Sequence, residues 1–240
     1  MEKPRQTVWM PRFWERLAAA LLALAAASPA RAGSDWQAWI DQSVSRDLSD
    51  RATVRVVQSF RYSFDESQLA TYYLEAGGTW TAWSWLDLGA GYRQQYDRRD
   101  GHWVEENRPL ADVTPRWKTR LATLSDRNRL EYRFRDGQDD IWRYRNKLTL
   151  QWNAWEAGFG LKPYVAAEAF VDESADLQDR NRTRFALGIR TDPDRHLLRN
   201  VEARWAQALA MDYSVTVQRT KVDDEWMDEY IAGVQLGVQF

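Results

Sequence analysis

The chain has 240 residues, a formal net charge of −2 at pH 7, 28% charged residues and no cysteine. This length fits one domain, and the near-neutral charge balance gives no reason to expect a nucleic-acid partner. The absence of cysteine excludes disulfides, thiolate metal sites and a lipid-modified N-terminal cysteine.

Residues 1–32 have the features of a secretory signal peptide. Basic residues precede an apolar run at 17–27, and residues 30–32 (Ala-Arg-Ala) fit the small-x-small rule for cleavage. An apolar run of this length is too short to span a bilayer, which argues against an uncleaved membrane anchor. We expect cleavage after Ala32 and a mature domain of residues 33–240. No later stretch approaches the length of a membrane helix, so strands would have to serve any membrane role.

Segment after segment then places an apolar residue at every second position. Such a period of two is typical of strands with one apolar face. The alternating segments are 54–62, 72–80, 86–92, 130–134, 142–150, 165–171, 183–189 and 230–240. Helical periodicity fits none of them as well, so the predicted fold class is all-β.

The charges indicate which face of these strands points inward. A soluble barrel would hold the apolar face inside, whereas a transmembrane barrel would turn it outward. The polar positions carry sixteen Lys and Arg against six Asp and Glu, a segregation that suits a narrow lumen filled by long side chains. Tryptophans cluster near expected strand ends, as at Trp80, Trp83 and Trp85, which fits membrane interfaces better than an ordinary core. We therefore predict a single antiparallel transmembrane β-barrel with a polar, arginine-rich lumen.

The expected connections fall into two alternating sets. The short or partly apolar set, which should face the periplasm, is 48–50, 81–84, 119–125, 153–158 and 191–200. The acidic set, which should face outward, is 65–68, 97–107, 136–140, 172–179 and 222–228.

The last strand keeps its alternation up to the final residue. Tyr230, Leu236, Val238 and Phe240 share one apolar face, and a C-terminal strand ending on Phe is typical of bacterial outer-membrane barrels, whose assembly machinery reads that strand. We therefore expect an outer-membrane location, with lipid, lipopolysaccharide and the barrel-assembly machinery as partners. With Phe240 in the periplasm, an even number of strands would place the start of the first strand in the periplasm too. The segment 36–44 precedes a short turn of the periplasmic type, however, so it would run inward from outside. The candidate strand segments number eleven if 199–219 is one long strand and twelve if it breaks near Ala210–Asp212. Because outer-membrane barrels usually have an even number of strands, we predict about twelve, with ten strands and a non-spanning N-terminal segment as the alternative.

The segment 127–150 is predicted to be a hairpin with its turn at 136–140. Centring it on Gln138 gives the cross-strand pairs Arg133 with Arg143, Glu131 with Arg145, and Arg129 with Lys147. Arg133 and Arg143 would then need a carboxylate from elsewhere, for which Glu168, Glu202 and Asp112 are available. The predicted lumen charge ladder comprises Arg129, Glu131, Arg133, Arg143, Arg145, Lys147, Glu168, Arg182, Arg184, Glu202 and Arg204.

Several short motifs in this region resemble a known family. They are Arg108-Pro109, the run 127–133 (RNRLEYR), the run 143–148 (RYRNKL), Pro163-Tyr164 followed by Glu168, and the terminal Phe240. Together they resemble the outer-membrane β-barrel family called domain of unknown function 2490, over nearly all of the mature chain. The resemblance implies the barrel fold. The family has no established activity, so it implies no functional residue.

Three classes of function remain open at this point. An arginine-lined pore would favour small anionic solutes or oligosaccharides, whereas arginines and acids that pair with one another would plug a structural barrel. An adhesion or assembly role would act through the acidic loops. Barrel hydrolases use a histidine with a serine two residues later, and neither His102 nor His196 has that neighbour. We expect no catalysis, no cofactor and no metal site.

Overall fold

A computed structural model describes residues 35–153, 161–173, 182–191, 208–222 and 225–240. The predicted signal peptide and cleavage site lie outside these residues. Every regular element in the described ranges is a β-strand, as predicted from the period-two pattern. The strands are β1 (Asp35–Ser49), β2 (Ala52–Ser63), β3 (Gln68–Trp83), β4 (Leu86–Arg99), β5 (His102–Lys118), β6 (Ala122–Arg135), β7 (Ile141–Trp152), β8 (Leu161–Asp172), β9 (Arg182–Thr191), β10 (Ala208–Val222) and β11 (Glu225–Gln239).

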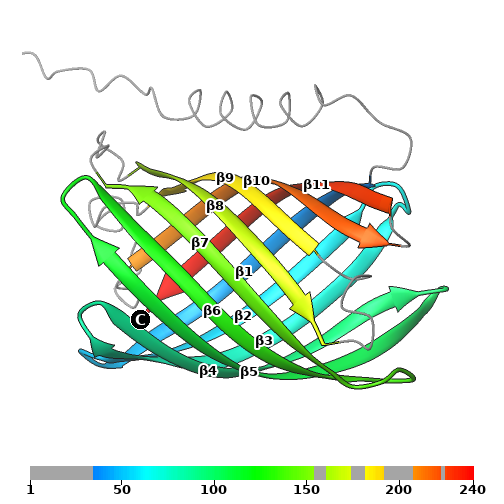
Figure 1. Ribbon diagram of the computed structural model, residues 1–240, viewed down its shortest axis with the longest axis horizontal. Helices are drawn as coiled ribbons and strands as arrows, with labels where there is room; N and C mark the ends of the chain where they lie inside the picture. Colours follow the sequence, from blue (N-terminus) through cyan, green and yellow to red (C-terminus); the bar gives the residue numbers. More distant parts are fainter. Residues whose placement is uncertain (1–34, 154–160, 174–181, 192–207, 223–224) are drawn as a thin grey trace, which may run out of the picture. The chain divides into compact units, whose positions relative to one another are not determined.

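These strands form one closed barrel (Figure 1). Neighbours in sequence pair antiparallel from β1 to β11, and β1 then pairs with β11 in parallel, from Asp35 opposite Glu229 to Ser45 opposite Gln239. The amide of Phe240 extends this seam by donating to the carbonyl of Ser45 at 2.9 Å. The C-terminal ends of β1 and β11 therefore lie at the same end of the barrel.

The predicted counts of about twelve strands, or ten, are both wrong, because the described residues close the barrel with eleven. The parallel seam removes the need for an even number, and β1 is a full member of the wall instead of a non-spanning segment. β10 also runs unbroken through Asp212. That carboxylate accepts a hydrogen bond from Tyr164 at 2.7 Å and pairs with Arg190 at 3.2 Å, so a polar residue in mid-strand does not end the strand.

The predicted acidic connection at 97–107 is much shorter in the structure. Only Asp100 and Gly101 separate β4 from β5, and their positive φ values of 49° and 79° fit the tight two-residue turn of a hairpin. Most of the predicted loop is therefore strand, and Glu106 becomes a wall residue of β5.

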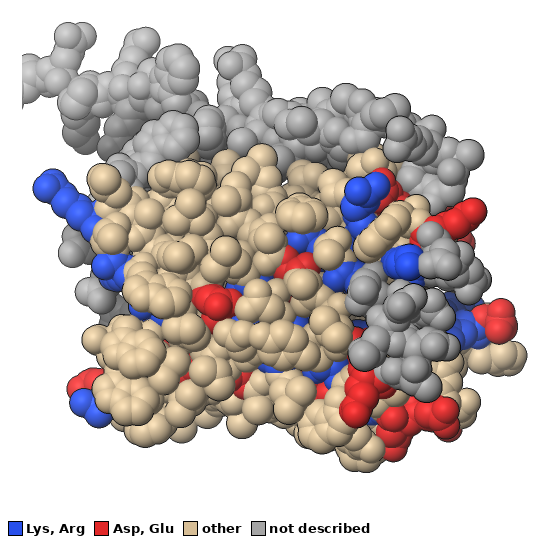
Figure 2. All heavy atoms as spheres, in the orientation of Figure 1, with Lys and Arg blue, Asp and Glu red and all other residues tan. Residues whose placement is uncertain are grey.

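The burial pattern of the wall is the reverse of that in a soluble protein, because polar side chains face inward and large apolar side chains face outward. Among the described residues, six apolar side chains are buried against seventeen polar or charged ones. Large apolar side chains lie outside instead, for example Leu187 at 65% exposure and Phe185 at 57%. Figure 2 shows a mostly uncharged surface on the face in view, with a few acidic and basic groups visible at its centre and more of them near the ends of the barrel.

The described residues include no helix long and apolar enough to cross a membrane.

Candidate functional site: the charged interior

The interior charges are organised by the β6–β7 hairpin, whose register differs from the prediction. Arg133 lies opposite Ile141, Glu131 opposite Arg143, and Arg129 opposite Arg145. The predicted pairs are therefore wrong by two residues on β7. The pairs centre on Gly137, which has a positive φ of 68°, instead of Gln138. A shift of two keeps every side chain on its own face, so the inward set is unchanged while its partners change.

Glu131 lies at the centre of the cluster and is fully buried, with 0% exposure. Arg145 donates from Nη1 to Glu131 Oε1 at 2.8 Å. The guanidiniums of Arg108 and Arg129 lie 3.6 and 3.8 Å from the same carboxylate. Three cations from three strands thus share one anion. Such a buried carboxylate is tolerated only because cations surround it.

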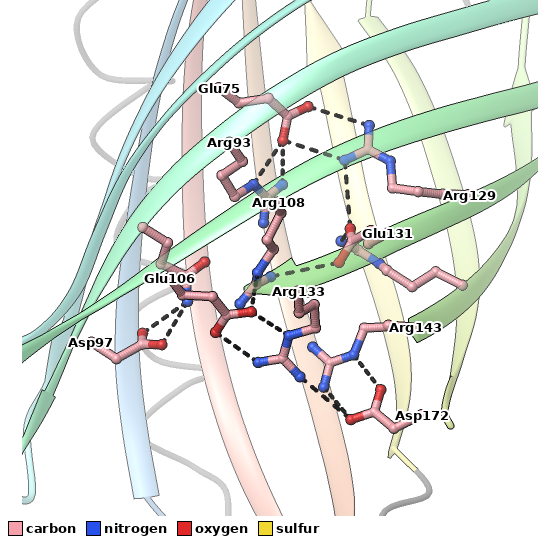
Figure 3. A network of polar contacts seen from close by, with 12 residues as sticks. Glu75, Arg93, Asp97, Glu106, Arg108, Arg129, Glu131, Arg133, Arg143 and Asp172 are labelled. Carbon is pink, nitrogen blue, oxygen red and sulfur yellow. Dashed lines mark hydrogen bonds and ion pairs between the residues drawn. The ribbon is translucent and has the colours of Figure 1, made fainter. Parts of the chain in front are cut away.

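A second group lies toward the end of the barrel that contains the 136–140 turn (Figure 3). Glu106 binds Arg108 at 2.6 Å and accepts a bidentate pair from Arg133, whose Nη2 bond is 2.8 Å. Asp172 accepts from Arg143 at 2.5 and 2.6 Å and lies 3.4 Å from Arg133. These two carboxylates are the partners that Arg133 and Arg143 were expected to need. Neither was predicted, because both were assigned to loops.

Two further carboxylates connect this group to the rest of the wall. Glu75 accepts from Arg93 at 2.8 Å and from Arg129 at 3.3 Å. Glu168 accepts from Arg127 at 2.8 Å and Arg145 at 2.7 Å. The available partner Asp112 binds Arg129, at 2.8 and 2.9 Å, instead of Arg133 or Arg143.

Aromatic rings continue these contacts across the opposite wall. Guanidinium groups stack on ring faces within the range of cation–π attraction. The contacts, as distances to ring centroids, are Arg93 to Tyr73 at 4.1 Å, Arg61 to Tyr73 at 5.3 Å, Arg61 to Trp39 at 4.0 Å, Arg184 to Trp39 at 4.8 Å, Arg184 to Phe170 at 4.5 Å and Arg145 to Phe170 at 4.7 Å.

The ion pairs and ring contacts together form a closed circuit. It runs through Arg93, Tyr73, Arg61, Trp39, Arg184, Phe170, Arg145, Glu131, Arg129, Glu75 and back to Arg93. We call this set the inner circuit. Arg93 and Arg129 of this circuit are each 6% exposed, so little water reaches them.

A cavity of about 370 Å³ adjoins the inner circuit and is lined by residues from all eleven described strands. Nine cations and five carboxylates line it: Arg55, Arg61, Arg93, Arg127, Arg129, Arg145, Lys147, Arg184 and Arg190 against Asp41, Glu75, Asp112, Glu168 and Asp212. Arg55, Arg61 and Lys147 form no ion pair with any residue in the described ranges. Among the described residues Arg55 donates to Ser43 Oγ, at 3.1 Å, and its side chain is exposed to the cavity that it faces.

A second cavity of about 440 Å³ lies toward the end that contains Phe240. Both cavities are lined by Thr79, Arg55, Arg190, Asp212 and Gln235, so they meet at these residues. We call the two together the basic chamber.

The structure places most predicted ladder residues on this interior. Arg182 donates to Thr220 at 3.2 Å, and Arg184 donates to Gln218 at 2.5 Å. Glu202 and Arg204 lie outside the described residues. At the C-terminus, Leu236 is 37% exposed on the outward face, and Tyr230 stacks on Trp36 with ring centroids 5.1 Å apart.

Comparison with known proteins adds the following findings. Residues 36–198 match the model of a family described as "Protein of unknown function (DUF2490)". A search of curated proteins finds no match. Among solved structures, the chain is similar to an anion-selective porin from Comamonas acidovorans, with a TM-score of 0.36 and 14% sequence identity. That alignment covers 78% of this chain and 55% of the porin, so the chain spans about half the porin's length.

Proposed function

The chain belongs to the DUF2490 family of proteins of unknown function, and we propose that it is a bacterial outer-membrane β-barrel whose basic chamber admits small anionic solutes. The main support for anionic solutes is the charge of the chamber lining, which contains nine cations and five carboxylates.

The outward face supports membrane insertion. Aromatic side chains form two outward groups, one near each end of the barrel. The group near the Phe240 end comprises Trp80, Trp83, Trp85, Trp117 and Trp152, and the other comprises Tyr62, Phe64, Trp103, Phe134 and Trp142. Trp142 and Trp152 are ten residues apart on β7. At about 3.4 Å per residue and a tilt of about 40°, this separation is about 26 Å along the barrel axis, close to the apolar band of about 25 Å in outer-membrane barrels.

Orientation follows from the proposed assembly role of the C-terminal strand, which would place the Phe240 end of the barrel in the periplasm. Turn length does not distinguish the two ends, because two-residue connections lie at the Phe240 end (50–51 and 84–85) and at the opposite end (100–101). The apolar face of β11 that includes Leu236 would contact lipid and serve the assembly machinery. Lipopolysaccharide would surround the opposite end. The basic chamber then opens toward the periplasm.

The chamber favours anions for a local reason. Most interior cations are already neutralised by the buried carboxylates, but Arg55, Arg61 and Lys147 have no ion-pair partner in the described part of the chain. The resulting excess of positive charge in a low-dielectric wall attracts anions and repels cations. A volume of about 370 Å³ suits solutes the size of a small carboxylate or sugar acid.

Outer-membrane fractionation and heat-modifiable gel migration test the location. Planar-bilayer recording under a salt gradient tests the solute class, with anion preference as the expected result. The double variant Arg55→Glu/Lys147→Glu should reverse that preference. Arg98→Glu is the matched control, because Arg98 lies on the outward face, where it stacks on Trp103. A wild-type barrel that prefers cations overturns the proposed solute class.

One observation favours a second candidate, a closed barrel with a structural or interaction role. Glu106, Arg108 and Glu131 are 2%, 4% and 0% exposed, so the ion pairs toward the outer end exclude water. Inserted wild-type protein that gives no conductance would favour this candidate. In that case the basic chamber would be a pocket that opens only toward the periplasm.

A further inference from the structure

The outward surface of β6 and β7 carries a hydrogen-bonded polar cluster near the middle of the wall, and a second outward cluster, formed by Tyr92, Gln94, Glu105 and Asn107, lies on β4 and β5. Asn146 donates from Nδ2 to Asp126 Oδ1 at 2.6 Å and to Asn128 Oδ1 at 3.0 Å. The hydroxyl of Tyr144 donates to Asn128 Oδ1 at 2.5 Å. Asn128 also donates to the backbone carbonyl of Asp126 at 3.1 Å. We call Asp126, Asn128, Tyr144 and Asn146 the outward polar patch.

The patch lies midway between the two aromatic groups. Trp142 pairs with Tyr132 near one end of the hairpin, and Trp152 pairs with Ala122 at the other. Asn128 pairs with Asn146 at the centre of this span. In an inserted barrel this is the middle of the hydrocarbon layer, where lipid offers no hydrogen bonds and a carboxylate is costly. Lipid head groups cannot reach it.

Two small side chains lie next to the patch. On β8, which adjoins β7 (Figure 1), Ala169 pairs with Asn146 and Ala167 pairs with Leu148. Both alanines are exposed. Small residues beside hydrogen-bonding side chains are the composition of protein–protein contacts within membranes, because they let two backbones approach closely.

From these observations we propose that the outward face of β6–β8 is the contact surface for a second copy of this chain. The patch offers both a hydrogen-bond donor and acceptors, so it is self-complementary, which favours a second copy as the occupant. After the bonds above, Asn128 retains one amide hydrogen, and Asn146 Oδ1 and Asp126 Oδ2 have no partner among the described residues. A two-fold axis parallel to the barrel axis lets Asn128 of each copy donate to Asn146 of the other. Reciprocal pairing of this kind is the signature of an isologous dimer.

This inference rests on the proposed membrane insertion but not on the proposed solute class. The chain contains no cysteine, so single cysteines report contacts without background. Leu148→Cys lies beside the patch, and Val56→Cys on β2 is the matched control. The two native side chains are 44% and 45% exposed, and each lies fifth from the Phe240 end of its strand. We expect a short bismaleimide to link Leu148→Cys into dimers in isolated outer membranes and to leave Val56→Cys monomeric.

A second variant distinguishes a contact from an exposed polar cluster. Adding Asn128→Leu and Asn146→Leu to Leu148→Cys should abolish most of the cross-linked dimer while the protein still fractionates with the outer membrane. If the patch faced lipid instead, the same change would leave cross-linking unaltered and raise the urea midpoint of the barrel. That result, equal cross-linking at Val56→Cys, or a cross-linked product that contains another protein, overturns the proposal. Failure to reach the outer membrane overturns the proposed function instead.

Discussion

Replacing Glu131 by Gln should destabilise the barrel more than removal of any exposed carboxylate. Glu131 has no solvent exposure and lies 2.8, 3.6 and 3.8 Å from the guanidiniums of Arg145, Arg108 and Arg129. At an effective dielectric of about 20, each attraction is on the order of 4 kcal/mol at about 4 Å. Much of this sum offsets the desolvation of the groups themselves. Because Gln leaves three buried cations without their shared anion, we expect a net loss of about 3–5 kcal/mol.

The assay is urea unfolding of protein refolded into lipid vesicles, followed by tryptophan fluorescence and by heat-modifiable migration. Asp228→Asn is the control, since the Arg219–Asp228 pair has the same form at 2.7 Å but is 49% and 21% exposed. Exposed pairs contribute about 0–1 kcal/mol. The double variant Glu131→Gln/Arg145→Met should recover part of the loss. Equal costs for Glu131→Gln and Asp228→Asn would refute the assignment of Glu131 as the shared buried anion.

Three other changes test separate parts of the barrel. Gly188→Ala should lower the free energy of unfolding by about 1–3 kcal/mol in the same assay, because a Cβ there would lie 2.4 Å from Cζ of Tyr164. The control Gly78→Ala should be near neutral, because its Cβ would lie 3.8 Å from the nearest atom. Trp39→Ala removes the ring between Arg61 and Arg184. We expect a loss of about 3–5 kcal/mol and a larger single-channel current, because the side chains of the inner circuit fill the interior at this level; an unchanged current would show that they do not limit ion flow. Phe240→Ala keeps the backbone hydrogen bond to Ser45 but should reduce the yield of this protein in the outer-membrane fraction. The control is Val44→Ala on the same seam, and equal yields of the two variants would show that the terminal aromatic residue is not an assembly signal.

The local pattern of the sequence was enough to predict the strands and their inward faces. Alternation is a property of each segment alone, so Arg129, Glu131 and Arg145 could be assigned to one face without knowing their neighbours. Partners depend instead on turn geometry. The hairpin centre at Gly137 differs by one residue from the predicted centre, and that difference moves every pair by two.

Glu106 and Asp172 were missed for a related reason. Both stand next to loop-like acidic residues, and composition alone cannot distinguish a strand end from a loop. Glu106 lies two positions before Arg108, so the period of two could have placed both on the inward face. The excess of interior cations was overestimated because these carboxylates were left out.

The strand count depended on a contact that no local pattern reveals. β1 and β11 are neighbours only because the sheet closes, and their parallel pairing involves the two ends of the described chain. A rule based on even strand numbers cannot anticipate a seam of this kind.

The parallel seam also has a kinetic consequence. Each of the other strand pairs joins segments that are adjacent in sequence, whereas the pairs between β1 and β11 span almost the whole chain. Contacts of such long range bear the largest loop-closure cost, so they form last during folding. Parallel ladders are also slightly less stable per residue than antiparallel ones. The seam between β1 and β11, from Asp35 to Ser45, is therefore the last part of the barrel to close, and it should be the first part to separate under force or heat.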